Sequence, residues 1–219
     1  MIRVHRAPEP PTFDAQVREP GLRAIAEMVG ETPSGKKRPG RPRKKIADRR
    51  EDIPAKEFPD FWTLALDDLM SSYHEVCSYC GIRIEHTTGV ASVDHMVAKS
   101  KDWRRVYEWD NYRLASLLLN SRKSIHELLD PFEIEDGWFQ LELFGFQVIP
   151  NASLTPMQME RVVETISKLG LNKPWFCSAR QRYANRYIAI GDSFSTLQED
   201  CPFVAMELRR QGRLRIGDV

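Results

Sequence analysis

The sequence predicts an α+β protein, from the order of strand, turn and helix signals along its 219 residues. A short strand is expected over residues 91–97, followed by a helix over 110–129 with Asp110 at its cap. A hairpin is expected between residues 132–134 and 138–148, because Asp136-Gly137 is a strong turn pair. Amphipathic helices are expected on both sides of these segments.

The N-terminal third divides into an arm, a linker and a helix. Residues 1–30 form a helical arm, with apolar spacing over 12–30 that Pro20 should break or delay. Residues 31–56 are rich in Pro, Gly, Lys and Arg and too poor in apolar residues to hold a fold, which predicts a linker or an exposed insertion. Apolar residues then recur at helix spacing over 58–73, with Asp60 close enough to cap the helix.

The C-terminal part is predicted to be helical after the hairpin. Thr155 and Gln158 form a capping box with Pro156 at the first helical position, and Gly170 ends that helix. Further helices are expected over 173–190 and 202–210. A central domain is therefore assigned to residues 57–130 and a hairpin-plus-helix extension to 131–219.

Composition excludes several classes of protein. The hydrophobic fraction of 42% and the charged fraction of 29% are ordinary for a globular domain. No apolar run has the ~18 residues that a membrane span needs, and residues 1–6 lack the apolar stretch of a secretory signal. We therefore expect a cytoplasmic protein without a membrane partner, in which four cysteines do not form a disulfide framework.

Positive charge is concentrated in one segment. Residues 36–50 contain nine basic side chains and one acid, a local charge of +8, so the rest of the chain carries −7. The stretch 37–44 resembles an AT-hook, a motif that inserts arginines into the narrow minor groove of A·T-rich DNA. A mobile linker that binds polyanions without preference, or a nuclear localisation signal, are the alternatives. Its expected nucleic-acid-binding residues are Arg38, Arg41, Arg43 and Lys44.

The residues that indicate chemistry lie between 92 and 123. Asp94-His95 ends the expected strand, and Asn120 lies on the helix expected to cross it. Hydrolysis of a phosphodiester needs a nucleophilic water, a base to deprotonate it and a cation to take up charge. An acid and a histidine at a strand end, with a further ligand from a packed helix, fit these needs.

This ordered set resembles the HNH endonuclease family, whose core is the ββα-metal fold. The resemblance covers about residues 76–126 and includes Asp94-His95, Asn111, Asn120-x-x-Lys123 and an upstream Cys77-x-x-Cys80. It implies that His95 is the general base and that Asp94 and Asn120 bind one Mg²⁺ or Mn²⁺ ion. It implies further that Asn111 ties down the loop carrying the base and that Lys123 supports the site or a phosphate. Lys99 and Arg122 are expected to contact nucleic acid.

The pattern departs from the family at the zinc knuckle. Many HNH proteins have a second Cys-x-x-Cys before the last ligand, but Ser116 and Leu119 stand there in this chain. Two cysteines do not complete a tetrahedral zinc site, so structural zinc is not expected unless another ligand folds back. The residues that could do so are Cys177, Cys201, His74 and His86. His126 is an alternative third ligand, with a role as a surface residue favoured for it.

The sequence thus predicts a metal-dependent endonuclease acting on DNA, with RNA left open. Its flanks, including Leu129-Asp130-Pro131-Phe132, are loosely similar to the small HNH proteins of bacterial Septu and retron anti-phage systems. Two alternatives remain open. One is a non-catalytic nucleic-acid-binding protein with a degenerate HNH fold, and the other is a nuclease subunit that works only with a partner ATPase.

Overall fold

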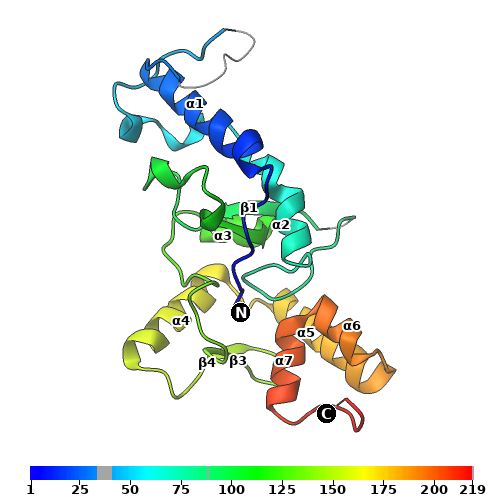
Figure 1. The fold of residues 1–219 in the computed structure, drawn as a ribbon. Helices are drawn as coiled ribbons and strands as arrows, with labels where there is room; N and C mark the ends of the chain where they lie inside the picture. Colours follow the sequence, from blue (N-terminus) through cyan, green and yellow to red (C-terminus); the bar gives the residue numbers. More distant parts are fainter. Residues whose placement is uncertain (34–40, 88, 219) are drawn as a thin grey trace.

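A computed structural model describes residues 1–33, 41–87 and 89–218. These residues form an α+β fold with two small antiparallel sheets, arranged along one long axis (Figure 1). Helix α1 lies at one end, the β1–β2 sheet with α2 and α3 lies in the middle, and the C-terminal elements form the other end (Figure 1). The elements are α1 (Glu19–Val29), α2 (Leu66–Ser72), β1 (Ala91–His95), β2 (Tyr112–Ser116), α3 (Leu117–Lys123), β3 (Phe139–Leu141), β4 (Val148–Pro150), α4 (Pro156–Leu169), α5 (Pro174–Asn185), α6 (Phe194–Asp200) and α7 (Pro202–Arg210).

The central unit has the order strand, strand, helix. Strand β1 pairs antiparallel with β2, with Asp94 opposite Arg113 and His95 opposite Tyr112. The side chain of Ser116 then accepts a hydrogen bond from the Leu119 backbone N–H and caps α3. The helix predicted over 110–129 is therefore wrong for 112–116, which pair with β1, and for 124–129, because α3 ends at Lys123. The leucines at 117–119 gave a helical period to a segment whose first half is a buried strand.

The N-terminal arm is helical from residue 14, because a π-helical turn over Asp14–Arg18 runs directly into α1. The predicted break at Pro20 is wrong, because helical geometry continues through this proline, which directly follows the wider π-helical turn. Gly30 ends α1 with φ +79°, a conformation that glycine adopts without strain.

The described part of the predicted linker packs on the arm. The backbone N–H groups of Ile46 and Ala47 both donate to the Met28 carbonyl, and Ile53 is buried. Short 3₁₀ turns follow over Arg50–Asp52 and Ala55–Glu57. Residues 41–57 are thus more ordered than their composition predicted, because they add to the hydrophobic core of α1 and not to one of their own.

The helix predicted over 58–73 is confirmed in part. A 3₁₀ turn over Phe61–Ala65 leads into α2, and Asp60 precedes the turn without a side-chain capping bond. The C-terminal hairpin is displaced from its prediction: β3 and β4 are joined by residues 142–147, and Gly137 lies before β3. Strand pairing at 139–141 requires partners at 148–150, which a turn at Asp136-Gly137 cannot supply.

The predicted capping box is confirmed at the start of α4, where Thr155 and Gln158 exchange hydrogen bonds, and Gly170 ends the helix in the left-handed region. Helices α5 and α7 match their predictions closely, whereas α6 was not predicted. One cluster of buried apolar side chains connects the arm, the central unit and the C-terminal helices. Within the described ranges, no helix has the length and apolar character needed to cross a membrane.

Candidate active site

Strand β1 directs Asp94 and His95 to opposite faces of the small sheet, because successive side chains of a strand alternate. Asp94 contacts Lys123 of α3, whereas the His95 ring contacts Trp62. The backbone of two neighbouring residues thereby supplies an acid on one face and an imidazole on the other.

The His95 ring is held between two aromatic rings. It meets Trp62 edge-on at a centroid distance of 4.9 Å and Tyr112 at 5.1 Å, and the residue is 8% exposed. Its Nε2 lies 3.0 Å from the Val106 carbonyl oxygen. Because a carbonyl only accepts, Nε2 must carry the proton, which leaves the lone pair of the neutral ring on Nδ1. Nδ1 has no hydrogen-bond partner among the described residues.

The surroundings of His95 keep it neutral. Burial lowers its pKa to about 3, and the positive charges of Lys99 and Lys123 act in the same direction. The hydrogen bond to Val106 opposes the shift without reversing it. The ring therefore presents a proton acceptor at any pH near neutrality.

Asn111 fixes the long connection between β1 and β2. Its Oδ1 accepts from the Val97 N–H at 2.8 Å, and its Nδ2 donates to the carbonyls of Val97 and Arg105 at 3.1 and 2.8 Å. The residue is fully buried. These bonds pin both ends of the loop that carries Lys99 and Val106, the role that the HNH resemblance implies for it.

The Asp94 carboxylate is engaged on both oxygens. The Lys123 ammonium lies 3.1 Å from Oδ1, and the Tyr79 hydroxyl donates to Oδ2 at 2.5 Å. Lys123 also donates to the His95 carbonyl at 2.8 Å, and it is 0% exposed, against 2% for Asp94. Burial raises the pKa of Asp94, while Lys123 and Tyr79 oppose this shift by stabilising the carboxylate.

Asn120 offers a free oxygen beside this pair. Its Nδ2 donates to the Ser92 hydroxyl at 3.1 Å and to the Val93 carbonyl at 3.2 Å. Its Oδ1 has no hydrogen-bond partner in the described part of the chain. Both contacts hold the side chain against β1, next to Asp94 in the strand.

The side chains of Asp94 and Asn120 suit a divalent ion, provided that the ion can compete with Lys123 for the carboxylate. Carboxylate and amide oxygens are the ligands that Mg²⁺ and Mn²⁺ prefer, and Asp94 and Asn120 supply one of each. Lys123 holds one of the Asp94 oxygens, so an ion binding there shares the carboxylate with the ammonium or displaces it. Among the described residues, no group of three or more His, Cys, Asp or Glu side chains converges in a way that could hold a metal.

Lys99 lies on the His95 side of the sheet. Its ammonium is 3.9 Å from the centroid of the Trp62 ring, the same ring that contacts His95. No carboxylate lies within 4 Å of it in the described chain. Half-buried, it has a pKa lowered by desolvation, with Asp60 opposing the shift. A cation without an ion-pair partner thus stands beside the proposed base.

The other predicted residues lie apart from this cluster. The Arg122 guanidinium donates to the Leu169 carbonyl and lies over Trp175, so α3 uses it to hold α4. His126 lines a separate cavity of about 450 Å³ that includes neither Asp94 nor His95. Arg38 lies outside the described residues.

Tyr79 is a site residue that the sequence analysis missed. It belongs to the Cys77–Cys80 turn, which closes with bonds from Gly81 N–H to the Cys77 carbonyl and from Cys77 N–H to the Ile82 carbonyl. This turn carries the Tyr79 hydroxyl to Asp94. The only available signal was an aromatic residue with a polar tip between two cysteines.

The Cys77 thiol is tied to β2. Its Sγ accepts from the Ser116 N–H at 3.4 Å. Burial raises the pKa of Cys77, but hydrogen bonds from Cys80 and from backbone amides outweigh burial and bring it to about 6. Ser116, which stands at a position of the family's second cysteine pair, therefore contacts the knuckle through its backbone.

No protein-family model matches this chain, and no curated protein matches it in sequence.

Proposed function

We propose that this protein is a metal-dependent endonuclease of the HNH type that hydrolyses phosphodiester bonds in DNA. The observation that carries the proposal is the tautomer of His95. Its Nε2–H donates to the Val106 carbonyl, and Nδ1 keeps a lone pair. That tautomer can accept a proton from water. A buried histidine with a purely structural role would be expected to use both ring nitrogens.

In this proposal each residue has a separate task. His95 Nδ1 takes the proton of the attacking water, and Asn111 holds the loop that orients His95. Lys99 faces the charge on the phosphate. Asp94 and Asn120 hold one Mg²⁺ or Mn²⁺, which would neutralise charge on the phosphate and the leaving oxygen. An arriving phosphate raises the pKa of His95 by the same Coulombic effect through which Lys99 lowers it, so the base strengthens when substrate binds.

One observation favours a second candidate, a nucleic-acid-binding protein without catalysis. Both Asp94 oxygens already bind protein donors, and the buried Lys123 ammonium lies where positive charge is needed. If that ion pair persists in the presence of Mg²⁺, the ion is excluded and the site binds phosphate without cleaving it.

Nicking of supercoiled plasmid in Mg²⁺ or Mn²⁺, with EDTA as control, separates the two candidates. Replacing the base should lower the rate by ~10²–10⁴-fold. Because His95 is packed between two rings, His95→Ala opens a cavity, and His95→Gln serves as a second variant that fills it. Cleavage at the wild-type rate by a folded His95→Gln protein would exclude the general-base role. Activity that requires an added ATPase would instead identify a partner-dependent nuclease.

Metal binding can be tested apart from cleavage. Titration of Mn²⁺ followed by calorimetry should show weaker binding to Asn120→Ala, because one ligand oxygen is removed, and retained binding to Asn120→Asp, because a carboxylate oxygen replaces the amide. Equal affinities for wild type and Asn120→Ala would show that Asn120 is not a ligand.

A further inference from the structure

The basic segment after residue 40 is held in place against α1. The Arg43 backbone N–H donates to the Glu27 carboxylate at 3.0 Å, and Ile46 and Ala47 donate to the Met28 carbonyl at 2.8 and 3.2 Å. A mobile tether would make no such bonds. The backbone of this segment therefore has a fixed position relative to the arm, and its side chains start from fixed points.

The charges of this segment fall into two groups. Lys45 pairs with Asp48 at 2.6 Å, Arg49 with Asp52 at 2.9 Å, and Arg50 with Glu31. The charged side-chain groups of the other three, Arg41, Arg43 and Lys44, form no ion pair among the described residues, and residues 34–40 contain no acid. In addition, Arg43 Nε is buried without a hydrogen-bond partner in the described chain. Only the second group has positive charge left for a polyanion.

A row of contacts links the second group to His95. The Arg43 backbone is bonded to Glu27 of α1, and Gly21 of the same helix packs against the Tyr107 ring. The Tyr107 ring stacks on Trp62 at a centroid distance of 6.1 Å, and the Lys99 ammonium lies over the Trp62 ring at 3.9 Å. The basic segment is therefore connected to the proposed catalytic side chain through α1, Tyr107 and Trp62.

The chemistry of this region favours duplex over single-stranded nucleic acid. Proteins that bind single strands stack bases on exposed aromatic side chains. Here Lys99 lies over the Trp62 ring, and the guanidinium groups of Arg50 and Arg104 both lie over the Trp103 ring. The large exposed aromatic residues of the described chain, Phe144 and Trp175, lie in the C-terminal half. The region thus offers cations to phosphates and no platform for bases.

We propose that Arg41, Arg43, Lys44 and Lys99 form one duplex-DNA-binding face that leads to His95, while the neighbouring Lys45, Arg49 and Arg50 contribute little to binding. The inference deepens the proposed function, on which it rests for the substrate class. It divides a segment that the sequence presents as nine equivalent cations.

The test is the salt dependence of duplex binding by the full-length protein, measured by fluorescence anisotropy in EDTA. The first variant is Arg41→Gln, Arg43→Gln, Lys44→Gln, and the matched variant in the same segment is Lys45→Gln, Arg49→Gln, Arg50→Gln. Each lost phosphate contact should reduce the log–log salt slope by about 0.9. The first variant should therefore lose roughly three units and bind more weakly, the second less than one, and Lys99→Gln about one.

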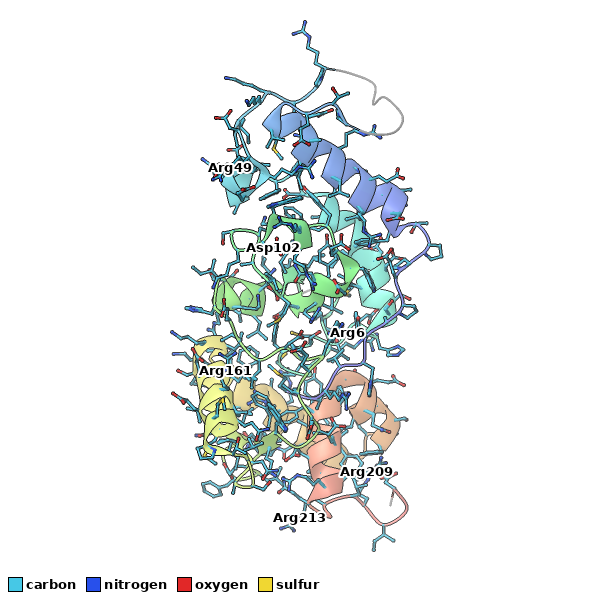
Figure 2. All side chains as sticks on the ribbon, turned by 60° about the vertical axis from the view of Figure 1, so that its left-hand side comes forward. Arg6, Arg49, Asp102, Arg161, Arg209 and Arg213 are labelled. Atoms are coloured by element: carbon cyan, nitrogen blue, oxygen red, sulfur yellow. The ribbon has the colours of Figure 1, made fainter. Side chains whose placement is uncertain are left out.

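A distant pair controls for position. Arg209 and Arg213 also have no carboxylate within 4 Å in the described residues, but they lie at the opposite end of the molecule from Arg49 (Figure 2). Arg209→Gln with Arg213→Gln should leave the slope unchanged.

Three results would overturn the inference. Equal losses from both triple variants would mean that the segment binds as an unstructured polycation. Unchanged slopes in both would mean that it does not contact DNA. Equal competition by a single strand of the same sequence would exclude duplex selectivity. Because the assay contains no divalent ion, a wild-type protein that never cleaves would contradict the proposed function and leave this partition of charges standing.

Discussion

Asp94 and Glu207 are both buried carboxylates beside a two-stranded antiparallel sheet, but their counter-ions differ. Glu207 of α7, 0% exposed, accepts from the Leu141 N–H of β3 at 2.7 Å and from Arg210 at 2.8 Å. The Arg210 side chain is 41% exposed. The partner of Asp94 is Lys123, which is entirely buried. One ion pair reaches water and the other is enclosed.

The neighbours of the two carboxylates also differ. Around Glu207, the described donors and acceptors are used in joining α7 to β3, and Gln211 adds a bond to the Leu141 carbonyl. Beside Asp94, Asn120 Oδ1 has no partner in the described chain, and on the opposite face of the sheet the same is true of His95 Nδ1. A buried charge is therefore a weak sign of function, whereas unused acceptors next to one indicate a site for water or a cation.

The largest expected effect is on stability when Asp94 is removed. Asp94→Ala leaves a buried ammonium without its counter-ion and should lower the free energy of unfolding by about 3–5 kcal/mol. Glu207→Ala should cost less, about 1–3 kcal/mol, because Arg210 can turn to water and the main loss is the bond to Leu141. Urea unfolding followed by circular dichroism measures both.

A double variant tests whether the charges of Asp94 and Lys123 stabilise each other. Asp94→Ala combined with Lys123→Met removes both charges and should recover much of the lost stability. If the double variant is as unstable as the sum of the two single variants, the ammonium and the carboxylate are not coupled in the folded protein.

The next effect concerns the hydroxyl that holds Asp94. Tyr79→Phe removes a hydrogen bond to a charged acceptor and should cost about 1.5–3 kcal/mol. Tyr107→Phe is the matched control, since its hydroxyl donates to the neutral Pro59 carbonyl at 2.8 Å, and it should cost about 0.5–1.5 kcal/mol. Equal losses in thermal or urea unfolding would mean that the carboxylate is not ionised.

The last expected effect, limited in size because the measurement covers only pH 6.5 to 5, is the pH dependence contributed by His95. Its folded pKa of about 3 lies below the ordinary value of 6.5, so the unfolded chain binds the proton more readily. This contribution to stability is complete above pH 6.5 and is lost as the pH falls towards 3, by up to about 1.4 kcal/mol per unit. Between pH 6.5 and 5 the wild type should lose up to about 2 kcal/mol more than His95→Gln. Parallel pH profiles for the two proteins would show that folding does not lower the pKa of His95.

The sequence alone determined the features that depend on neighbouring residues. The capping box at Thr155 and Gln158 and the end of α4 at Gly170 were both predicted, because their hydrogen bonds join residues within a few positions. The order of the candidate site residues could also be read from the sequence. Asp94-His95 and Asn120-x-x-Lys123 place a carboxylate, an imidazole, an amide and an ammonium at fixed spacing.

Which of these side chains contact one another depends on the tertiary structure. Residues 112–116 became a strand because β1 supplies a partner, although the leucines that follow favoured a helix. Tyr79 reaches Asp94 from 15 positions away, and Lys123 from 29. Lys45 and Lys44 are adjacent and identical in the sequence, yet only Lys45 has a carboxylate beside it among the described residues. Strand pairing, side-chain burial and the neutralisation of charges depend on residues that are distant in the sequence. The spacing of neighbouring residues therefore does not predict them.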